Sequence, residues 1–194
     1  YIESPATRLL QQKSRVGDFA HLVIHSSIIR PAANEFIREY VRRLHGGAWT
    51  PIHPLLDDVL HDTYGIMVYQ EDVIKICHHF AGLDLADADV LRRAMSGKYR
   101  SRKEFDRIAQ RFFDNCRERG YSESLTQEVW RQIASFAGYS FSKAHSASYA
   151  VESFQSLYLK AHYPLEFMVA VINNFGGFFH RWVYFNEARR WGGV

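Results

Sequence analysis

Segments of helical length, each with its own start and stop signal, follow one another through most of this 194-residue chain. Residues 34–46 open with an asparagine suited to an N-cap and end at a glycine. Residues 101–120 open with a serine and a glutamate three positions apart, which is a capping-box pattern. Because apolar residues recur at helical spacing, each segment must bury one face against another. The pattern predicts a mainly α, multi-helical fold.

Further helices are predicted by the same signals. They cover residues 51–65, 66–82, 87–96, 124–138, about 142–164, 165–174 and a last stretch near 184–191. On the long helix that ends at Pro164, we expect one stripe to be core, namely Ala147, Ala150, Phe154, Leu157, Tyr158 and Ala161; Tyr149 is assigned to core as well. Residues 21–29 fit a strand or a helix equally well, and residues 65–69 fit an extended segment. Gly176 and Gly177 are the best candidates for a subdomain boundary.

Composition narrows the class of protein. The two cysteines, Cys77 and Cys116, form no zinc pattern or disulfide framework. No apolar run approaches the roughly 20 residues that cross a bilayer, and the first residues do not form a signal peptide. A cytoplasmic protein without a membrane partner is therefore expected. The chain lacks an initiator methionine, so we expect a piece of something larger. His78 and His79 are adjacent and predict no metal site.

Positive charge is concentrated in one segment. Eight basic and two acidic side chains lie between Arg92 and Arg111, although the whole chain carries a net charge of only +3. The basic residues are Arg92, Arg93, Lys98, Arg100, Arg102, Lys103, Arg107 and Arg111. Such clustering indicates a phosphate-bearing partner, because arginine matches two phosphate oxygens. A solvated helix face is the alternative.

A second basic feature is the sequence "FSKAH", residues 141–145, at the start of the predicted long helix. A helix start offers unpaired backbone N–H groups and a partial positive charge. Lys143 adds a full charge, His145 a hydrogen-bonding ring, and Ser142 can cap the helix. The segment therefore fits an anion site, although an ordinary helix start that faces water fits it too.

Four stretches together resemble the bacterial DNA polymerase III α subunit family, the C-family replicative polymerases. They are "TYGIMVYQEDV" (63–73), "ADVLRRAMSGK" (88–98), "FAGYSFSKAHSASYA" (136–150) and "LKAHYPLEFM" (159–168), in that order. The resemblance implies that the whole chain lies in the multi-helical fingers domain. Residues 1–62 would then be the proximal part of the fingers, residues 63–175 the central part with the nucleotide-facing motifs, and residues 176–194 the start of the following helical segment.

The resemblance also implies roles for individual residues. It places Arg92 and Arg93 on the triphosphate of the incoming deoxynucleoside triphosphate, and Ser142, Lys143 and His145 near that nucleotide. The concentration of positive charge, in turn, predicts contacts to template-primer DNA from Lys98, Arg100, Arg102 and Lys103, and Arg30 is a further candidate. Ser142 stands where the family usually has asparagine and Ala144 where it usually has serine, which weakens the case for contacts there.

The family's metal-binding aspartates precede the matched part, so no catalytic or metal-binding residue is expected in this chain. Asp57, Asp58 and the aspartates of residues 84–89 are interpreted as helix-surface and capping acids. Mg²⁺ is expected in the palm of a full-length DNA polymerase, and this chain alone should be inactive. Other replicase subunits are expected partners. A non-catalytic helical nucleic-acid-binding module and a scaffold for replication subunits remain the alternatives.

Overall fold

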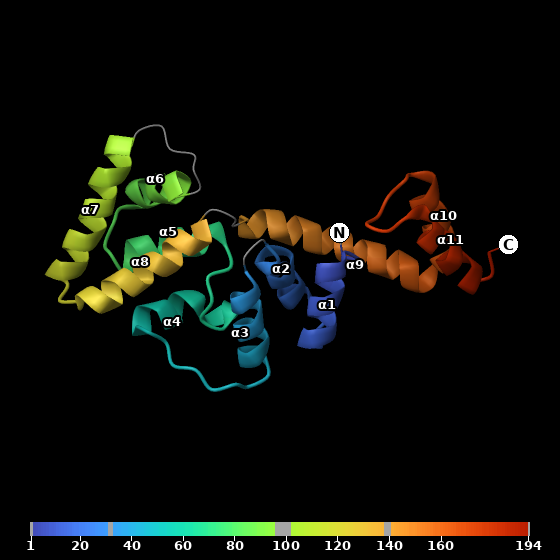
Figure 1. The fold of residues 1–194 in the computed structure, drawn as a ribbon, viewed down its shortest axis with the longest axis horizontal. Coiled ribbons are helices and arrows are strands. Elements are labelled where there is room, and N and C mark those ends of the chain that lie inside the picture. The colour runs from blue at the N-terminus through green and yellow to red at the C-terminus, as the bar shows by residue number, and fades with distance from the viewer. Residues whose placement is uncertain (1, 31–32, 96–101, 138–140, 194) are drawn as a thin grey trace. The chain divides into compact units, whose positions relative to one another are not determined.

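The computed structural model describes residues 2–30, 33–95, 102–137 and 141–193. Within these residues the chain forms α-helices, one 3₁₀ helix and a single isolated β-bridge, and no strand (Figure 1). The predicted mainly α fold is therefore confirmed. The helices are α1 (Pro5–Ser14), α2 (Phe19–Ile28), α3 (Asn34–Leu44), α4 (Pro54–Leu60), η1 (His61–Thr63), α5 (Gln70–His79), α6 (Leu85–Met95), α7 (Arg102–Glu118), α8 (Glu123–Ala137), α9 (Lys143–His162), α10 (Pro164–Asn173) and α11 (Arg181–Arg190).

The chain divides into two compact units. The continuous unit comprises Arg30–Lys143, and the discontinuous unit comprises Tyr1–Ile29 together with Ala144–Val194. Gly176 and Gly177 lie inside the discontinuous unit, between α10 and α11. The division into residues 1–62, 63–175 and 176–194 follows the family resemblance and stays a prediction.

The continuous unit is built around α5. This helix packs against α4, α6 and α8, and α7 packs against α6 and α8 (Figure 1). The apolar faces of these helices form one core, whose largest fully buried side chains include Ile76, Phe80, Leu91, Phe112 and Phe136. Fully burying a side chain of this size contributes about 1.5–3 kcal/mol, so this core supplies most of the unit's stability.

Helix α5 starts four residues later than the predicted helix over residues 66–82. The reason is Asp72, whose Oδ2 accepts hydrogen bonds from the backbone N–H groups of Val68 and Tyr69, both 2.8 Å away. The carboxylate thus bonds the N–H groups that precede the helix, and the regular helix begins only after them, at Gln70. Residues 66–68 have no regular structure, and Tyr69 forms the isolated parallel bridge with Phe141.

Two predicted caps are wrong by one or two residues. The cap position of α3 is held by Ala33, without a side-chain hydrogen bond, and Asn34 is the first helical residue. Helix α8 is predicted over residues 124–138 with Ser124 as its capping residue. In the structure the hydroxyl of Ser122 accepts a hydrogen bond from the backbone N–H of Leu125 at 3.2 Å. In both cases the helix itself lies where the periodicity predicts it.

In the discontinuous unit, residues 21–28 belong to helix α2, which resolves the strand-or-helix ambiguity. Every residue from Leu22 to Ile28 is buried. A helix buried on all sides shows no amphipathic period, which explains why the sequence did not distinguish it from a strand.

The predicted core stripe of α9 is wrong for its large residues, since Phe154, Leu157 and Tyr158 are 39%, 42% and 58% exposed. The buried residues of α9 are small: Ser146, Ala150 and Ser153. The hydroxyls of Ser146 and Ser27 form a buried hydrogen bond between α9 and α2. Small side chains allow the two backbones to approach closely, and the aromatic residues are left on the outer face.

The C-terminal helices α10 and α11 pack on each other around Met168 and Tyr184. Lys160 of α9 pairs with Glu3 and with Glu187 of α11, the latter at 2.7 Å. Among the described residues, no helix combines the length and the apolar character needed to span a membrane.

Candidate functional site

Arg92 and Arg93 share one carboxylate on helix α6. The Nε and Nη2 of Arg92 donate to Asp89 Oδ1 at 2.9 and 2.8 Å, and Arg93 Nε lies 3.0 Å from Asp89 Oδ2. Arg92 Nη1 also donates to Gln70 Oε1, 3.0 Å away at the start of α5. The side chain of Arg92 is 17% exposed and that of Arg93 is 47% exposed. Arg92 is therefore held in place, whereas Arg93 faces solvent.

The segment that contains Lys143 meets the same end of α5. The backbone N–H of Gln70 donates to the carbonyl oxygen of Phe141 at 3.0 Å, next to the Tyr69–Phe141 bridge. The backbone N–H of Lys143 donates to Glu71 Oε2 at 3.0 Å. Lys143 Nζ lies 5.5 Å from the centre of the Tyr69 ring. Residues more than 70 positions apart in sequence thus meet at one helix start.

The structure therefore groups Arg92, Arg93 and Lys143 around the start of α5, within the continuous unit. Asp89 pairs with both arginines, whereas Glu71 bonds the backbone N–H of Lys143 rather than its ammonium group. The first N–H of α9 is already bonded to Glu71, so a bound anion would rely on side-chain cations more than on the helix start.

Ser142 and His145 complete the predicted nucleotide set. Ser142 is half-buried and immediately precedes α9. His145 is exposed and belongs to the discontinuous unit, where its ring meets Tyr149 edge-on with ring centres 4.8 Å apart. A role for either residue at a nucleotide stays a prediction.

Arg30 is stacked rather than extended toward solvent. Its guanidinium carbon lies 3.6 Å from the centre of the Phe136 ring. Nη1 and Nη2 are buried and have no hydrogen-bond partner among the described residues. Burial lowers the pKa of Arg30 to about 10. A contact with DNA would require this side chain to leave the Phe136 ring.

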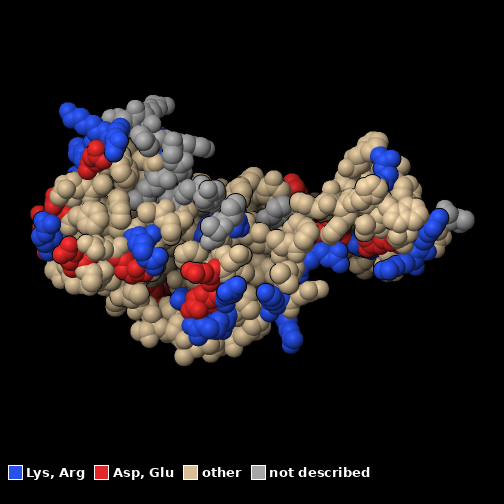
Figure 2. Space-filling model, viewed as in Figure 1, with Lys and Arg blue, Asp and Glu red and all other residues tan. Residues whose placement is uncertain are grey.

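The other residues predicted to bind DNA lie on or before α7. Arg102 and Lys103 are exposed in its first turn. Arg107 and Arg111 pair with Asp87 of α6 and so contribute less free charge. Figure 2 shows Lys and Arg side chains over the start of α7 at the upper left of the view. Lys98 and Arg100 lie outside the described residues.

The aspartates of α4 and α6 have the structural roles that the pattern predicts or lie on the helix surface. Asp84 Oδ1 accepts the backbone N–H of Asp87 at 2.8 Å at the start of α6. Asp87 and Asp89 are each engaged by arginines. Within the part of the chain that is described, no three His, Cys, Asp or Glu side chains are grouped so that they could hold a metal ion.

Sequence reasoning missed three residues of this site: Gln70, Glu71 and Asp89. Asp89 could have been found, because it precedes Arg92 and Arg93 by three and four positions, the spacing of helical ion pairs. Gln70 and Glu71 have no such spacing to a cation, although they lie inside the family-like stretch at residues 63–73. Their partners are distant in sequence, and only the fold brings them near.

Arginines and a lysine from distant segments, gathered at one helix start on an all-helical scaffold, are typical of proteins that bind phosphate groups. Comparison with known families is more specific. Residues 1–120 match the family described as the bacterial DNA polymerase III alpha subunit finger domain. The chain belongs to this family.

Several curated proteins are similar over most of the chain. A DNA polymerase III subunit alpha from Neisseria meningitidis is 37% identical over 172 residues, which cover 89% of this chain and 15% of that protein. The protein of the same name from Saccharopolyspora erythraea is 36% identical over 199 residues, covering 98% and 16%. That of Staphylococcus aureus is 34% identical over 174 residues, covering 89% and 16%. The chain thus spans about a sixth of the length of these relatives.

Proposed function

We propose that this chain is the part of a DNA polymerase III alpha subunit that binds the triphosphate of the incoming deoxynucleoside triphosphate. Arg92, Arg93 and Lys143 would make the contacts, with Ser142 and His145 nearby. The observation that carries the proposal is the shared attachment of Arg92 and of the segment with Lys143 to the start of α5. Phosphoryl transfer depends on alignment and charge stabilisation, which fixed cations supply.

Arg93 is the residue that would meet the phosphate first. It is more exposed than Arg92, and its pairing with Asp89 is a partly exposed ion pair. Such pairs contribute only about 0–1 kcal/mol, so a triphosphate with several negative charges competes well for the guanidinium. Arg92 is held by both Asp89 and Gln70, so it would provide a fixed positive charge that positions the triphosphate.

DNA would be contacted by the basic segment, through Arg102 and Lys103 together with Lys98 and Arg100, and by Arg30 once it is released from Phe136. The whole protein would be a DNA polymerase of the replisome, working with other replicase subunits and with Mg²⁺ held by its palm. This chain by itself would align substrate without catalysing incorporation.

A helical nucleic-acid-binding module without nucleotide recognition is the second candidate, favoured by the exposed basic residues of α7. A titration of the chain with a deoxynucleoside triphosphate separates the two, since only a nucleotide site gives saturable binding that depends on Arg92 and Arg93.

The decisive experiment uses the full polymerase that carries this sequence. We expect Arg93→Ala to lower the efficiency of nucleotide incorporation by about ten- to hundredfold, because a charge-assisted contact is worth about 1.5–3 kcal/mol. The DNA dissociation constant should change much less. Arg117→Ala, which removes an exposed arginine paired with Asp114 on α7, is the control and should have little effect. Equal losses in DNA binding and incorporation would refute the proposal.

A further inference from the structure

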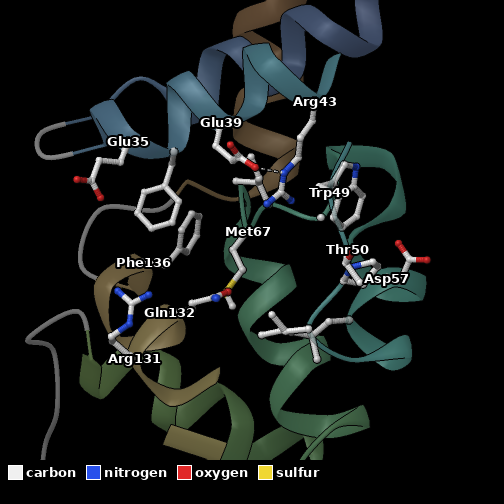
Figure 3. Close-up of a pocket in the computed structure, with 16 residues that line it drawn as sticks. Glu35, Glu39, Arg43, Trp49, Thr50, Asp57, Met67, Arg131, Gln132 and Phe136 are labelled. Atoms are coloured by element: carbon white, nitrogen blue, oxygen red, sulfur yellow. Dashed lines mark hydrogen bonds and ion pairs between the residues drawn. The ribbon is translucent and has the colours of Figure 1, made fainter. Parts of the chain in front are cut away.

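The continuous unit contains a cavity of about 240 Å³ away from the cation cluster. It lies between α3, residues 49–52, the start of α4, residues 65–67 and the last turns of α8 (Figure 3). Its lining does not include Arg92, Arg93 or Lys143. The proposed nucleotide site therefore does not account for this cavity.

The apolar walls of the cavity are formed by side chains that also belong to the core of the continuous unit. Leu56, Met67 and Phe136 are almost completely buried and line its inner surface. Trp49 forms another wall, with the Arg43 guanidinium 4.4 Å from the centre of its ring. The Trp49 ring lies directly against Gly65, where a Cβ atom would overlap it and where φ is +73°. Only glycine combines this backbone conformation with so close a contact.

Most charges around the cavity are already paired. Glu39 accepts hydrogen bonds from Arg42 at 2.6 and 2.8 Å and from Arg43 at 2.7 Å. Arg131 donates to both oxygens of Glu128, at 2.7 and 2.8 Å. The arginines at this cavity are thus engaged by the protein's own carboxylates.

Two carboxylates at the cavity have no such partner. The side chain of Asp57 makes no hydrogen bond or ion pair within the described residues. Glu35 makes no direct ion pair there either, and interacts with Arg131 only as a nearby charge. Figure 3 shows Glu35 and Asp57 at opposite ends of the drawn pocket, with the apolar walls between them. Both ends of the apolar interior therefore carry a carboxylate without a direct ion pair, and the negative charge is least balanced at Asp57.

We propose that this cavity is a docking site for a protein segment in which a large apolar side chain is flanked by lysine or arginine. The volume is below the roughly 300–1,000 Å³ of small-molecule pockets and suits one or two side chains. A preformed apolar pocket is where a partner's anchor residue binds. The rim carboxylates attract basic flanks and repel phosphate, so nucleotides and DNA are poor occupants.

The test uses the 194-residue chain and a fluorescently labelled, capped peptide with the sequence Lys-Phe-Leu-Lys. Two further peptides, Glu-Phe-Leu-Glu and Lys-Ser-Ser-Lys, lack the basic flanks and the apolar anchor respectively. Fluorescence anisotropy should detect saturable binding of the first peptide and much weaker binding of the other two. Equal binding of either control peptide, or no binding of the first, would overturn the proposal.

Matched variants place the binding at this cavity. Asp57→Asn and Glu35→Gln should each weaken the basic peptide about two- to fivefold, the value of one partly exposed ion pair. Asp58→Asn is the control, because Asp58 is the exposed neighbour of Asp57 in the same helix and does not line the cavity. An equal effect of Asp58→Asn, or competition by a deoxynucleoside triphosphate, would refute docking here and would leave the nucleotide proposal untouched.

Discussion

Gln70 joins two segments that are distant in sequence. Its side chain accepts a hydrogen bond from Arg92 on α6, and its backbone N–H donates to Phe141, two residues before Lys143. The adjacent Glu71 carboxylate accepts the N–H of Lys143. We therefore regard Gln70 and Glu71 as positioning residues for the proposed nucleotide site, since neither supplies a positive charge of its own.

Replacing Gln70 with leucine tests this role. Gln70→Leu keeps the backbone contact to Phe141 but removes the acceptor for Arg92. We expect KM for the incoming nucleotide to rise about three- to tenfold in the full polymerase, because a hydrogen bond to a charged group contributes about 1.5–3 kcal/mol and Asp89 still holds Arg92. Single-nucleotide incorporation measures the effect. Gln127→Leu, which removes a surface bond to Glu123, is the control, and a similar change in that variant would contradict a special role for Gln70.

Two buried titratable groups, one in each unit, respond to acid in opposite directions. Burial raises the pKa of Asp72 in the continuous unit to about 6, against the two hydrogen bonds from Val68 and Tyr69. The folded chain therefore binds this proton more tightly than the unfolded chain. Burial lowers the pKa of His25 in the discontinuous unit to about 4, so the folded chain binds that proton less tightly.

Between pH 6.5 and pH 4.5, acidification should thus add stability at Asp72 and remove it at His25, since stability follows the difference in bound protons. Hydrogen exchange resolved by residue should show stronger protection of α5 and weaker protection of α2 at the lower pH. Asp72→Asn should abolish the first trend and His25→Gln the second. The same trend in both helices would show that other groups control the pH response.

Helix α7 separates its basic residues into two sets. Arg102 and Lys103 are exposed in the first turn, whereas Arg107 and Arg111 pair with Asp87. An arginine that is already paired with a carboxylate attracts a DNA phosphate less strongly, because the carboxylate partly neutralises its charge. The helix therefore offers its first turn to DNA more than its middle.

The salt dependence of DNA binding distinguishes the two sets. Each lost phosphate contact lowers the slope of log K against log salt by about 0.9. The double change of Arg102 and Lys103 to alanine should therefore flatten the slope by nearly 2. The double change of Arg107 and Arg111 should alter it less, and an equal effect of the two pairs would mean that the ion pairs with Asp87 do not shield these arginines. Fluorescence anisotropy over a salt series provides the measurement.

For the molecule as a whole, the two units differ in how the chain builds them. The continuous unit is one uninterrupted stretch, and its core cluster lies entirely between Leu56 and Phe136. The discontinuous unit needs both ends of the chain, which Lys160 joins through Glu3 and Glu187. We therefore expect the first unit to fold alone and the second to require both pieces.

We expect residues 30–143, produced separately, to unfold in one cooperative transition with high helical content, as single domains of this size do. Circular dichroism during thermal unfolding measures this. Residues 144–194 serve as the comparison and should unfold without a sharp transition, because α1 and α2 are missing. A non-cooperative melt of residues 30–143 would show that the core requires the terminal segments.

Much of the fold could be predicted from local patterns. Helix periods, glycine stops and capping residues act over a few positions, so the sequence located α3, α6, α7, α8 and α10 to within a few residues. The cluster of arginines from Arg92 to Arg111 is equally a property of the chain alone. These features need no distant partner, and neither did the four sequence stretches that carried the resemblance confirmed by the family comparison.

Which partner each helix face meets depends on distant residues, and the local pattern is silent on it. Helix α2 is buried all round from Leu22 to Ile28 although it contains histidine and serine. The buried face of α9 consists of small residues, so the aromatic stripe of α9 was the wrong choice for core. The bonds that bring Arg92 and the segment with Lys143 to Gln70 connect α6, α5 and the start of α9. Such contacts form only when separate helices pack, after the chain has paid the entropy of closing long loops. A local sequence pattern therefore does not indicate them.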